Sequence, residues 1–483
     1  MGGGAFSQAS AQGEPTLNTP RMSPDVYFKL KELYSERLRS YFPAKTQVAS
    51  LKAAPEKADY GDMDFIIAHD DRVDFITIAN QIGAAAVICH DAHKSTMAVR
   101  RDGSQSSKRA VIYKHVNDTN PRKLKASATV SEEDFAQMDI EIVPTELFGW
   151  HSFYASYGDM AGLLGHIVHN LGFTVSDRGF WLRMKELDDS KKPPYKVNVA
   201  DQDGRILLSH DPADVMQFLG LSVQGYEAGF KTLDELYSWL GECRLLTWDA
   251  IKIRRDNAHE RNREQKRTVF SRFFNEWLPA HLSNAPTDAE TSAGEEANLA
   301  IKATSRARLN AKRAELVQEA LSFFNKEGEY TAMHAPLVRN IHSTVAAQLL
   351  RPILAQHSGK TDKNLNEVAR AFRRYVGVGE DGQLSMLETS RTDAESELWR
   401  LLEVRSMKGG VDQGVGVEGE GTGTSYGLKH EISVSAWARE HWEEVRALER
   451  QRLKAMLMPE SNRHSTTRGR LTFELSGRSE LSR

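Results

Sequence analysis

The sequence predicts an α+β fold in which a mixed sheet occupies the first third of the chain and helices dominate the rest. Short apolar runs typical of buried strands, FIIA (65–68) and AAVICH (85–90), alternate with segments of helical spacing. Helices and strands that mix within one compact segment are typical of a sheet covered by helices. The length of 483 residues predicts two or three domains rather than one.

The first helix is expected to begin at Ser23-Pro24-Asp25, because proline is tolerated in the first turn of a helix. Apolar residues then recur at helical spacing from Leu30 to Phe42. The elements expected after it are, in order, a strand at 65–68, a helix at 74–84, a strand at 85–90, a hairpin around a Gly/Ser-rich turn at 96–116, a strand at 138–144, a mainly helical stretch at 150–255 with a strand-like piece at 173–184, and a charged helix at 252–278.

Changes in composition divide the chain into segments. Stretches rich in Gly, Ser and Pro, or in small acidic residues, predict linkers and disordered ends. The expected segments are a disordered start at 1–22, a sheet-bearing domain at 23–146, a helical region at 147–282, a linker at 283–300, a helical domain at 301–408, a Gly-rich linker at 409–428, a helix at 429–460 and a basic disordered tail at 461–483.

Composition also narrows the class of protein. The chain is 40% hydrophobic with a formal net charge of −3, which is ordinary for a soluble protein and argues against a uniformly basic nucleic-acid binder. Two cysteines do not make a disulfide scaffold, so a reducing compartment is expected. No secretory signal and no membrane span are predicted, which favours an intracellular location, nucleus or cytoplasm.

Two aspartates, Asp62 and Asp64, stand at the start of the apolar strand in GDMDFIIA. Residues i and i+2 of a strand share a face, so both carboxylates are expected side by side, where they repel unless a cation lies between them. The predicted strand MDIEIVP places Asp139 and Glu141 on one face in the same way. Mg²⁺ prefers such hard oxygen ligands and completes its shell with substrate phosphates. The alternative interpretation is a pair of solvent-facing strand edges, and strand periodicity alone does not decide between the two.

Four blocks in order resemble the nucleotidyltransferase pattern of the DNA polymerase beta superfamily, and family X in particular. They are Ala49-Ser50 followed by Gly61-Asp62-Met63-Asp64, then MDIEIVPTELF, then HSFYASYGDMAGLLGHIVHNLGFTVSDRGFWL, and then LLSHDPADVMQFLGL. The block order also resembles that of fungal proteins with this domain. The resemblance spans about residues 27–225 and implies a nucleotidyltransferase palm followed by a helical thumb-like subdomain and a helical C-terminal region.

The resemblance assigns roles to individual residues. Asp62 and Asp64 would bind Mg²⁺ or Mn²⁺, and Asp139 would be the third ligand and lie near the attacking 3′ hydroxyl. Ser50 would hydrogen-bond the triphosphate of the nucleotide, and Lys52 would add positive charge there.

The resemblance also implies that Tyr154 would lie beside the sugar of the incoming nucleotide and Asp159 beside its base. Five positions depart from the family pattern. Ala49 replaces a glycine, Ala53 stands where an arginine holds the triphosphate, and Gln137 replaces a basic residue, while Ala155 replaces a phenylalanine and Glu141 a basic neighbour. The sequence therefore has few of the basic residues expected to bind phosphate, although all three aspartates expected to bind the metal are present.

The function expected from these observations is Mg²⁺-dependent transfer of a nucleotidyl group from an NTP or dNTP to a hydroxyl acceptor, with DNA or RNA as a possible partner. The alternative is a catalytically inactive protein of the same fold that binds nucleotides or nucleic acid and presents its C-terminal helices to a protein partner. A helical scaffold without a site, and a zinc site around Cys89-His90 and His93, are further alternatives with less support in the sequence.

Overall fold

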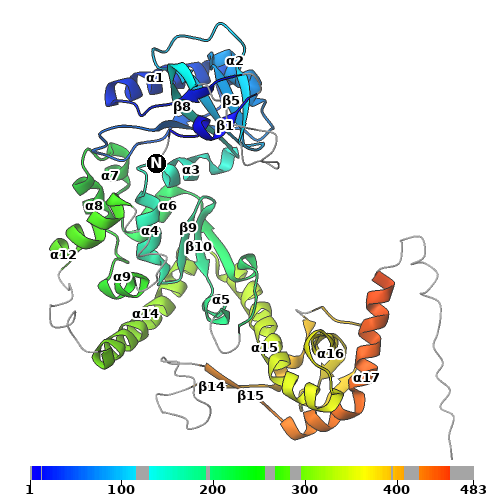
Figure 1. Ribbon diagram of the computed structural model, residues 1–483. Helices are drawn as coiled ribbons and strands as arrows, with labels where there is room; N and C mark the ends of the chain where they lie inside the picture. Colours follow the sequence, from blue (N-terminus) through cyan, green and yellow to red (C-terminus); the bar gives the residue numbers. More distant parts are fainter. Residues whose placement is uncertain are drawn as a thin grey trace, which may run out of the picture. The chain divides into compact units, whose positions relative to one another are not determined.

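The computed structural model describes residues 3–11, 14–115, 130–191, 196–255, 267–282, 295–392, 395–406 and 424–456. The fold is α+β, as the sequence predicts, and it divides into two compact units (Figure 1). The first unit comprises Met1–Arg183 and Arg205–Tyr330, and the second comprises Met184–Gly204 and Thr331–Arg483. None of the helices in the described ranges combines the length and apolar character that a membrane span requires.

An eight-stranded mixed sheet organises the beginning of the first unit. Its order is β1-β7-β5-β6-β8-β4-β3, and β2 pairs with β8 in addition. The central strand β8 is parallel to β4 on one side and antiparallel to β6 on the other. The strands are β1 (Ala9–Ser10), β2 (Thr16–Asn18), β3 (Val48–Ser50), β4 (Asp62–Ala68), β5 (Ala86–Cys89), β6 (Lys94–Arg100), β7 (Val111–His115) and β8 (Val130–Val143).

Two helices, α1 (Pro24–Tyr41) and α2 (Phe75–Ile82), pack on this sheet. Both begin and end close to the predicted positions. The Asp74 side chain caps α2 by accepting a hydrogen bond from the amide of Ile76, and Gly83 ends it with φ 75°, a conformation that favours glycine. The helices bury apolar side chains such as Tyr34 and Ile78 against the apolar face of the sheet. This core leaves the opposite face of β4 and β8 available for polar residues.

The prediction that residues 1–22 are disordered is wrong for the described part of that segment. It contains a 3-10 turn η1 (Phe6–Gln8) and the strands β1 and β2, which pair with β7 and β8. Phe6 is completely buried, and its ring meets the ring of Tyr113 edge-on at 5.5 Å between centroids. The local composition is typical of disorder, but sheet strands distant in sequence supply hydrogen bonds and an apolar site for Phe6.

The predicted hairpin at 96–116 is also wrong. The strands β6 and β7 exist, but both pair with β5, antiparallel in one case and parallel in the other. A Gly/Ser-rich turn between two strand-like runs is typical of a hairpin. Here a third strand inserts between the two, which local sequence does not reveal.

The rest of the first unit is mainly helical, as expected, around a small antiparallel sheet. The strand-like piece at 173–184 forms the hairpin β9 (Phe173–Ser176) and β10 (Gly179–Arg183), and β11 (Arg205–Ser209) pairs with β10. Around it lie η2 (Thr145–Leu147), α3 (Phe148–Ala155), α4 (Met160–His169), α6 (Pro212–Leu219), α7 (Val223–Ala228), α8 (Leu233–Gly241), α9 (Trp248–Arg255), α11 (Thr268–Arg272), the π-helical turn η4 (Phe273–Trp277), α12 (Leu278–His281) and α14 (Glu295–Phe323).

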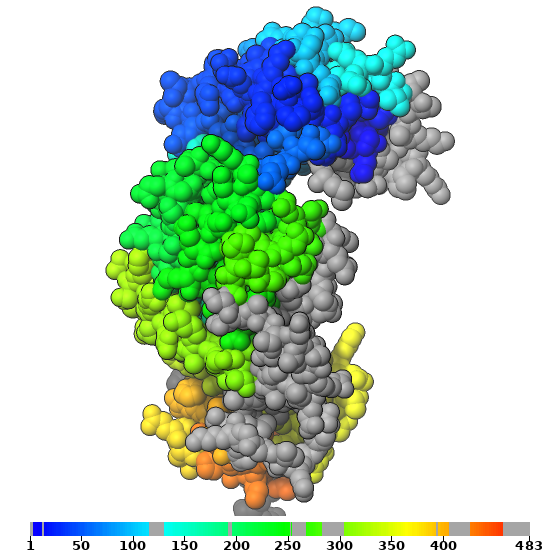
Figure 2. Space-filling view, turned by 90° about the vertical axis from the view of Figure 1, so that its left-hand side faces the viewer, coloured from blue at the N-terminus to red at the C-terminus, as the bar shows by residue number. Residues whose placement is uncertain are grey.

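An aromatic core holds this helical part together, with Phe173 stacked on Phe180 at 5.1 Å. The charged helix predicted at 252–278 is described only at its ends, as α9 and α11 to α12, because 256–266 lie outside the described residues. In the space-filling view, green residues of this part lie against blue residues of the sheet-bearing part (Figure 2). One hydrogen bond between the two parts runs from the Leu233 amide to the Glu56 carboxylate at 3.3 Å.

The second unit is built on long helices, but its bounds differ from the predicted ones. Residues 301–330, predicted to belong to the helical domain 301–408, lie in the first unit, and residues 184–204 of the predicted helical region 147–282 lie in the second, because contacts distant in sequence decide the division. The elements of the second unit are α5 (Lys185–Ser190), η3 (Asp201–Gly204), most of α15 (Glu327–Ser358), α16 (Asp362–Tyr375), β12 (Val376–Val378), β13 (Leu384–Met386), η6 (Leu398–Leu401), β14 (Leu402–Ser406), β15 (Thr424–Leu428) and α17 (Glu431–Met456).

Both predicted linkers are shorter than the sequence indicates at their described ends. Helix α14 already begins at Glu295, inside the linker predicted at 283–300. Strand β15 occupies 424–428 of the Gly-rich linker predicted at 409–428 and pairs with β14. The tail predicted at 461–483 lies outside the described residues.

Candidate metal centre

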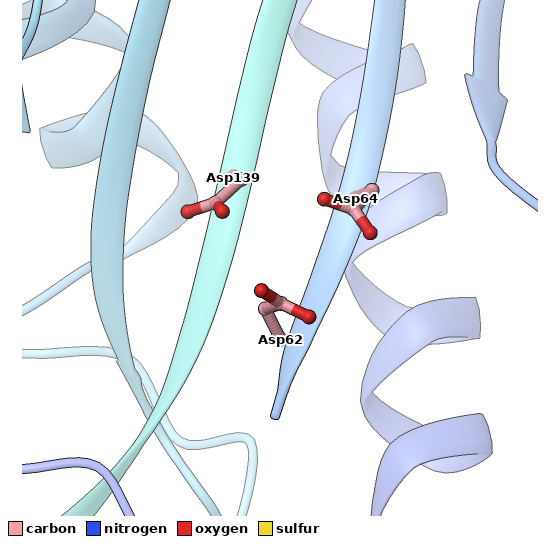
Figure 3. Close-up of side chains that lie close together, drawn as sticks. All are labelled: Asp62, Asp64 and Asp139. Atoms are coloured by element: carbon pink, nitrogen blue, oxygen red, sulfur yellow. The ribbon is translucent and has the colours of Figure 1, made fainter. Parts of the chain in front are cut away.

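Three aspartates converge on one face of the large sheet. Strands β4 and β8 run parallel in a register that places Asp64 beside Asp139 and Asp62 beside Gln137. One carboxylate oxygen from each of Asp62, Asp64 and Asp139 lies within 4.8 Å of the others (Figure 3). Within the described ranges, this is the one group of three or more His, Cys, Asp or Glu side chains with such a geometry. The acidic positions expected from sequence are therefore brought together.

The strand alternation explains why the carboxylates point the same way. On β4, Met63 and Phe65 are buried in the core below the sheet, so the residues between and before them face the other side. On β8, Met138 and Ile140 are buried in the same core, which turns Asp139 toward the face of the other two aspartates. The apolar pattern of two strands thus determines the placement of the charges.

Glu141, which shares a strand face with Asp139 in the sequence, is not part of this group. Its carboxylate forms an ion pair with the Lys94 ammonium at 2.9 Å. The neighbouring antiparallel strand β6 places Lys94 directly opposite Glu141. The negative charge of Glu141 is therefore balanced locally, whereas none of the three aspartates forms an ion pair with a described residue.

Burial, and to a smaller extent the neighbouring negative charges, raises the pKa of two of the three aspartates. Burial raises the pKa of Asp64 to about 7, with further contributions from the charges of Asp62 and Asp139. Burial also raises the pKa of Asp139 to about 6, and the charge of Asp62 adds to the effect. Asp64 nevertheless keeps contact with solvent, so a cation can reach it. A group of carboxylates with raised pKa values is one that a divalent cation would stabilise in its ionised form.

A hydrogen-bond network holds Asp139. The Thr96 hydroxyl donates to its carboxylate at 2.7 Å, and the Gln137 amide nitrogen donates to both oxygens at 3.1 and 3.2 Å. Because the single hydroxyl proton of Thr96 is used in this way, the His90 Nε2, 2.8 Å from the hydroxyl oxygen, acts as the donor to it. The amide of Ala5 in turn donates to the Gln137 side-chain oxygen at 3.1 Å. These bonds lower the pKa of Asp139 and oppose part of the burial effect.

Two lysines beside Asp64 were not predicted from sequence. The positive charges of Lys57 and Lys31 both act to lower the pKa of Asp64, against the larger effect of burial. Lys31 lies on α1, and its ammonium donates to the carbonyl of Leu51 at 2.5 Å. No residue spacing signals this placement, because it results from the packing of α1 on the sheet. The site therefore has positive charge next to the carboxylates, although the motif arginine is replaced by Ala53.

The residues expected to bind phosphate lie next to β4. Ser50 is the last residue of β3 and pairs with Phe65, one position beyond Asp64. The following amide, that of Leu51, donates to the carbonyl of Asp64 at 3.0 Å. Ser50 is thus adjacent to the triad along the sheet, and its contact with phosphate stays a prediction.

The Lys52 side chain interacts with main-chain carbonyls of the helical part. Its ammonium lies 3.2 Å from the carbonyl of Tyr226 and 3.4 Å from that of Glu227, and it lies over the Tyr226 ring at 4.9 Å from the centroid. Its own carbonyl accepts a hydrogen bond from the Tyr157 amide at 2.6 Å. Lys52 therefore joins the sheet-bearing part to the helical part of the first unit, a role that sequence did not suggest.

The two residues expected around the sugar and base also have other partners. Tyr154 on α3 is partly buried and packs against the aromatic core of the helical part. Asp159, just before α4, forms an ion pair with Arg267. Cys89 and His90 were considered as zinc ligands from sequence. In the structure the Cys89 thiol is exposed, and His90 belongs to the hydrogen-bond network at Asp139.

No model of a protein family matches this chain, and no curated protein matches it significantly.

Proposed function

We propose that the chain is a Mg²⁺-dependent nucleotidyltransferase in which the sheet-bearing part serves as the palm and residues 147–282 as a thumb-like subdomain. The observation that carries the proposal is the convergence of Asp62, Asp64 and Asp139 from two adjacent parallel strands. The donors are hard oxygens, burial together with the neighbouring carboxylates raises the pKa of two of the aspartates, and solvent reaches the site. The three aspartates therefore suit one or two Mg²⁺ or Mn²⁺ ions.

Each group has a distinct part in the proposed reaction. Asp62 and Asp64 would hold the ions, and Asp139 would complete the set on the side where the acceptor hydroxyl approaches. Bound divalent ions would stabilise the negative charge that develops on the attacking and leaving oxygens. Gln137 and Thr96 keep the Asp139 carboxylate oriented, so that little reorganisation is needed when an acceptor arrives.

Phosphate binding would depend on residues outside the motif. Lys57 supplies positive charge that acts on Asp64, where a triphosphate bound to the same ions would lie. Lys31 adds to it, although its ammonium also donates to the carbonyl of Leu51 and burial lowers its pKa. Lys52, the basic residue of the motif, is engaged with main-chain carbonyls. We propose NTPs or dNTPs as substrates and a nucleic-acid hydroxyl as the acceptor.

One observation favours a second candidate function, a catalytically inactive protein of the same fold that binds nucleotides. The Lys52 ammonium already donates to the carbonyl of Tyr226, and Ala53 supplies no charge. We therefore expect a triphosphate to bind more weakly than the motif implies. Such a protein would still bind divalent cations through its aspartates but would not transfer a nucleotide.

Incorporation of labelled NTPs and dNTPs into DNA and RNA primers, with Mg²⁺ or Mn²⁺, tests the proposal. The variant Asp64→Asn removes one triad charge with little change in shape. The matched control is Asp71→Asn, because Asp71 is exposed and lies in the loop after β4. We expect incorporation by the wild type and the control, and at least a 100-fold loss in Asp64→Asn.

Two results would count against the proposal. Equal incorporation by wild type and Asp64→Asn would refute the role of the triad. No incorporation by the wild type, with Mn²⁺ binding that Asp64→Asn abolishes, would refute the enzyme and support the second candidate.

A further inference from the structure

The second unit contains a cavity of about 510 Å³ with an unusual lining. It lies among α15, α16 and the C-terminal part of α17 (yellow to orange in Figure 1). Ten residues line it, and half of them are arginines: Arg351, Arg370, Arg373, Arg374 and Arg452. The other five are small or neutral polar residues, and none is acidic or aromatic. The cavity is thus a concentrated positive surface in a chain whose net charge is −3.

The arginines lie close together because of their spacing along the helices. On α16, Asn366, Arg370, Arg373 and Arg374 recur at intervals of four, three and one residues, which places them along one side of the helix. Arg351 of α15 faces them and donates to the Asn366 side chain. The two alanines of the lining, one from each helix, have side chains too short to fill the space between the guanidinium groups.

Nearby carboxylates balance only part of this charge. Glu449, which is fully buried on α17, accepts two hydrogen bonds from Arg452 at 2.8 Å and lies 4.0 Å from Arg374. Glu367 on α16 is paired with Arg446 and Arg450, neither of which lines the cavity.

Arg351 and Arg370 differ from Arg452 and Arg374, which interact with the Glu449 carboxylate. Within the described ranges neither of them forms an ion pair, and Arg370 is exposed. The positive charge of Arg351 and Arg370 is therefore available to an anion, which would also relieve the electrostatic repulsion among the five guanidinium groups.

We infer that this cavity binds a compact anion with several phosphate groups, such as an inositol polyphosphate or a linear polyphosphate. Guanidinium groups bind phosphate through paired hydrogen bonds, and a cavity of about 510 Å³ lined by five of them, of which Arg351 and Arg370 form no ion pair in the described ranges, has room and charge for more than a single phosphate. None of the described residues that line the cavity is an aromatic side chain on which a base would stack, which favours a small polyphosphate over single-stranded nucleic acid. The inference goes beyond the proposed function and does not depend on the three aspartates.

Calorimetric titration of the full chain in EDTA tests the inference, because without divalent ions the aspartates do not bind phosphate. The probes are inositol hexakisphosphate and sodium tripolyphosphate, compared with sodium sulfate and a single-stranded oligonucleotide. The test variant is Arg351→Gln combined with Arg370→Gln, since neither residue is paired with a buried carboxylate. The control is Arg439→Gln, an exposed α17 residue outside the cavity.

We expect one polyphosphate to bind per chain, more tightly than sulfate, and the double variant to bind it on the order of 100-fold more weakly, about tenfold for each arginine. The control should stay within about twofold of the wild type. Unchanged binding in the double variant, or an equal loss in the control, would overturn the inference. Preferential binding of the oligonucleotide, with an affinity that increases with its length, would instead indicate a nucleic-acid surface and overturn it as well.

Discussion

Replacing Asp64 with asparagine is expected to stabilise the metal-free protein above pH 7. Asp64 has a pKa of about 7 in the folded protein, compared with 3.8 for an ordinary aspartate. Folding therefore favours the protonated carboxyl. The stability that this preference contributes is fully present below about pH 4 and is lost as the pH rises through 7. Asparagine has no charge to lose, so the variant avoids this penalty.

The magnitude follows from the size of the pKa change. A shift from 3.8 to about 7 corresponds to an upper limit of about 4 kcal/mol, at 1.36 kcal/mol for each pH unit. Because the Asp64 side chain is in contact with solvent, screening reduces this value, and we expect about 1 to 2 kcal/mol. For a unit of this size, that is a rise in melting temperature of roughly 2 to 6 °C at pH 8.

Thermal unfolding in EDTA at pH 5, 6, 7 and 8 measures the effect. The difference between Asp64→Asn and wild type should already be roughly a third of its full value at pH 5, increase at pH 6, and reach its full value above pH 7. Saturating Mg²⁺ should then stabilise the wild type and reverse the order, by about 2.7 kcal/mol at a hundred times the dissociation constant. The control Asp71→Asn should follow the wild type throughout. A stabilisation that does not depend on pH, or none at pH 8, would refute the account of crowded charges.

Three other variants test the surroundings of the site and the fold. Thr96→Val removes a hydrogen bond to Asp139, so the pKa of that carboxyl should rise further and the midpoint of Mn²⁺ binding, measured by titration at several pH values, should move up by about one pH unit. Phe6→Ala should lower the free energy of unfolding in urea by about 3 kcal/mol, whereas a disordered segment would give no change. Arg452→Ala leaves the buried Glu449 carboxylate without its closest partner, and a loss of about 3 kcal/mol in the same assay is expected; an unchanged value would show that the pair contributes nothing.

The sequence alone determined the positions of the charges relative to the core. The alternation in GDMDFIIA and MDIEIVP requires the aspartates to face away from the buried side chains, and the structure has them there. It also predicted the α+β class and the start of α1 at Pro24, because these depend on periodicity and capping within a few residues.

Only the tertiary structure decided which strands are neighbours and which charges surround the site. The pairing of β4 with β8 places Asp64 beside Asp139 across 75 residues of sequence, and no local rule supplies that register. The packing of α1 brings Lys31 to the carboxylates, while the contact with the helical part draws Lys52 away. Each of these depends on hydrogen bonds and burial between residues distant in the chain. Local patterns therefore determine which face a side chain occupies, and long-range packing determines what it meets there.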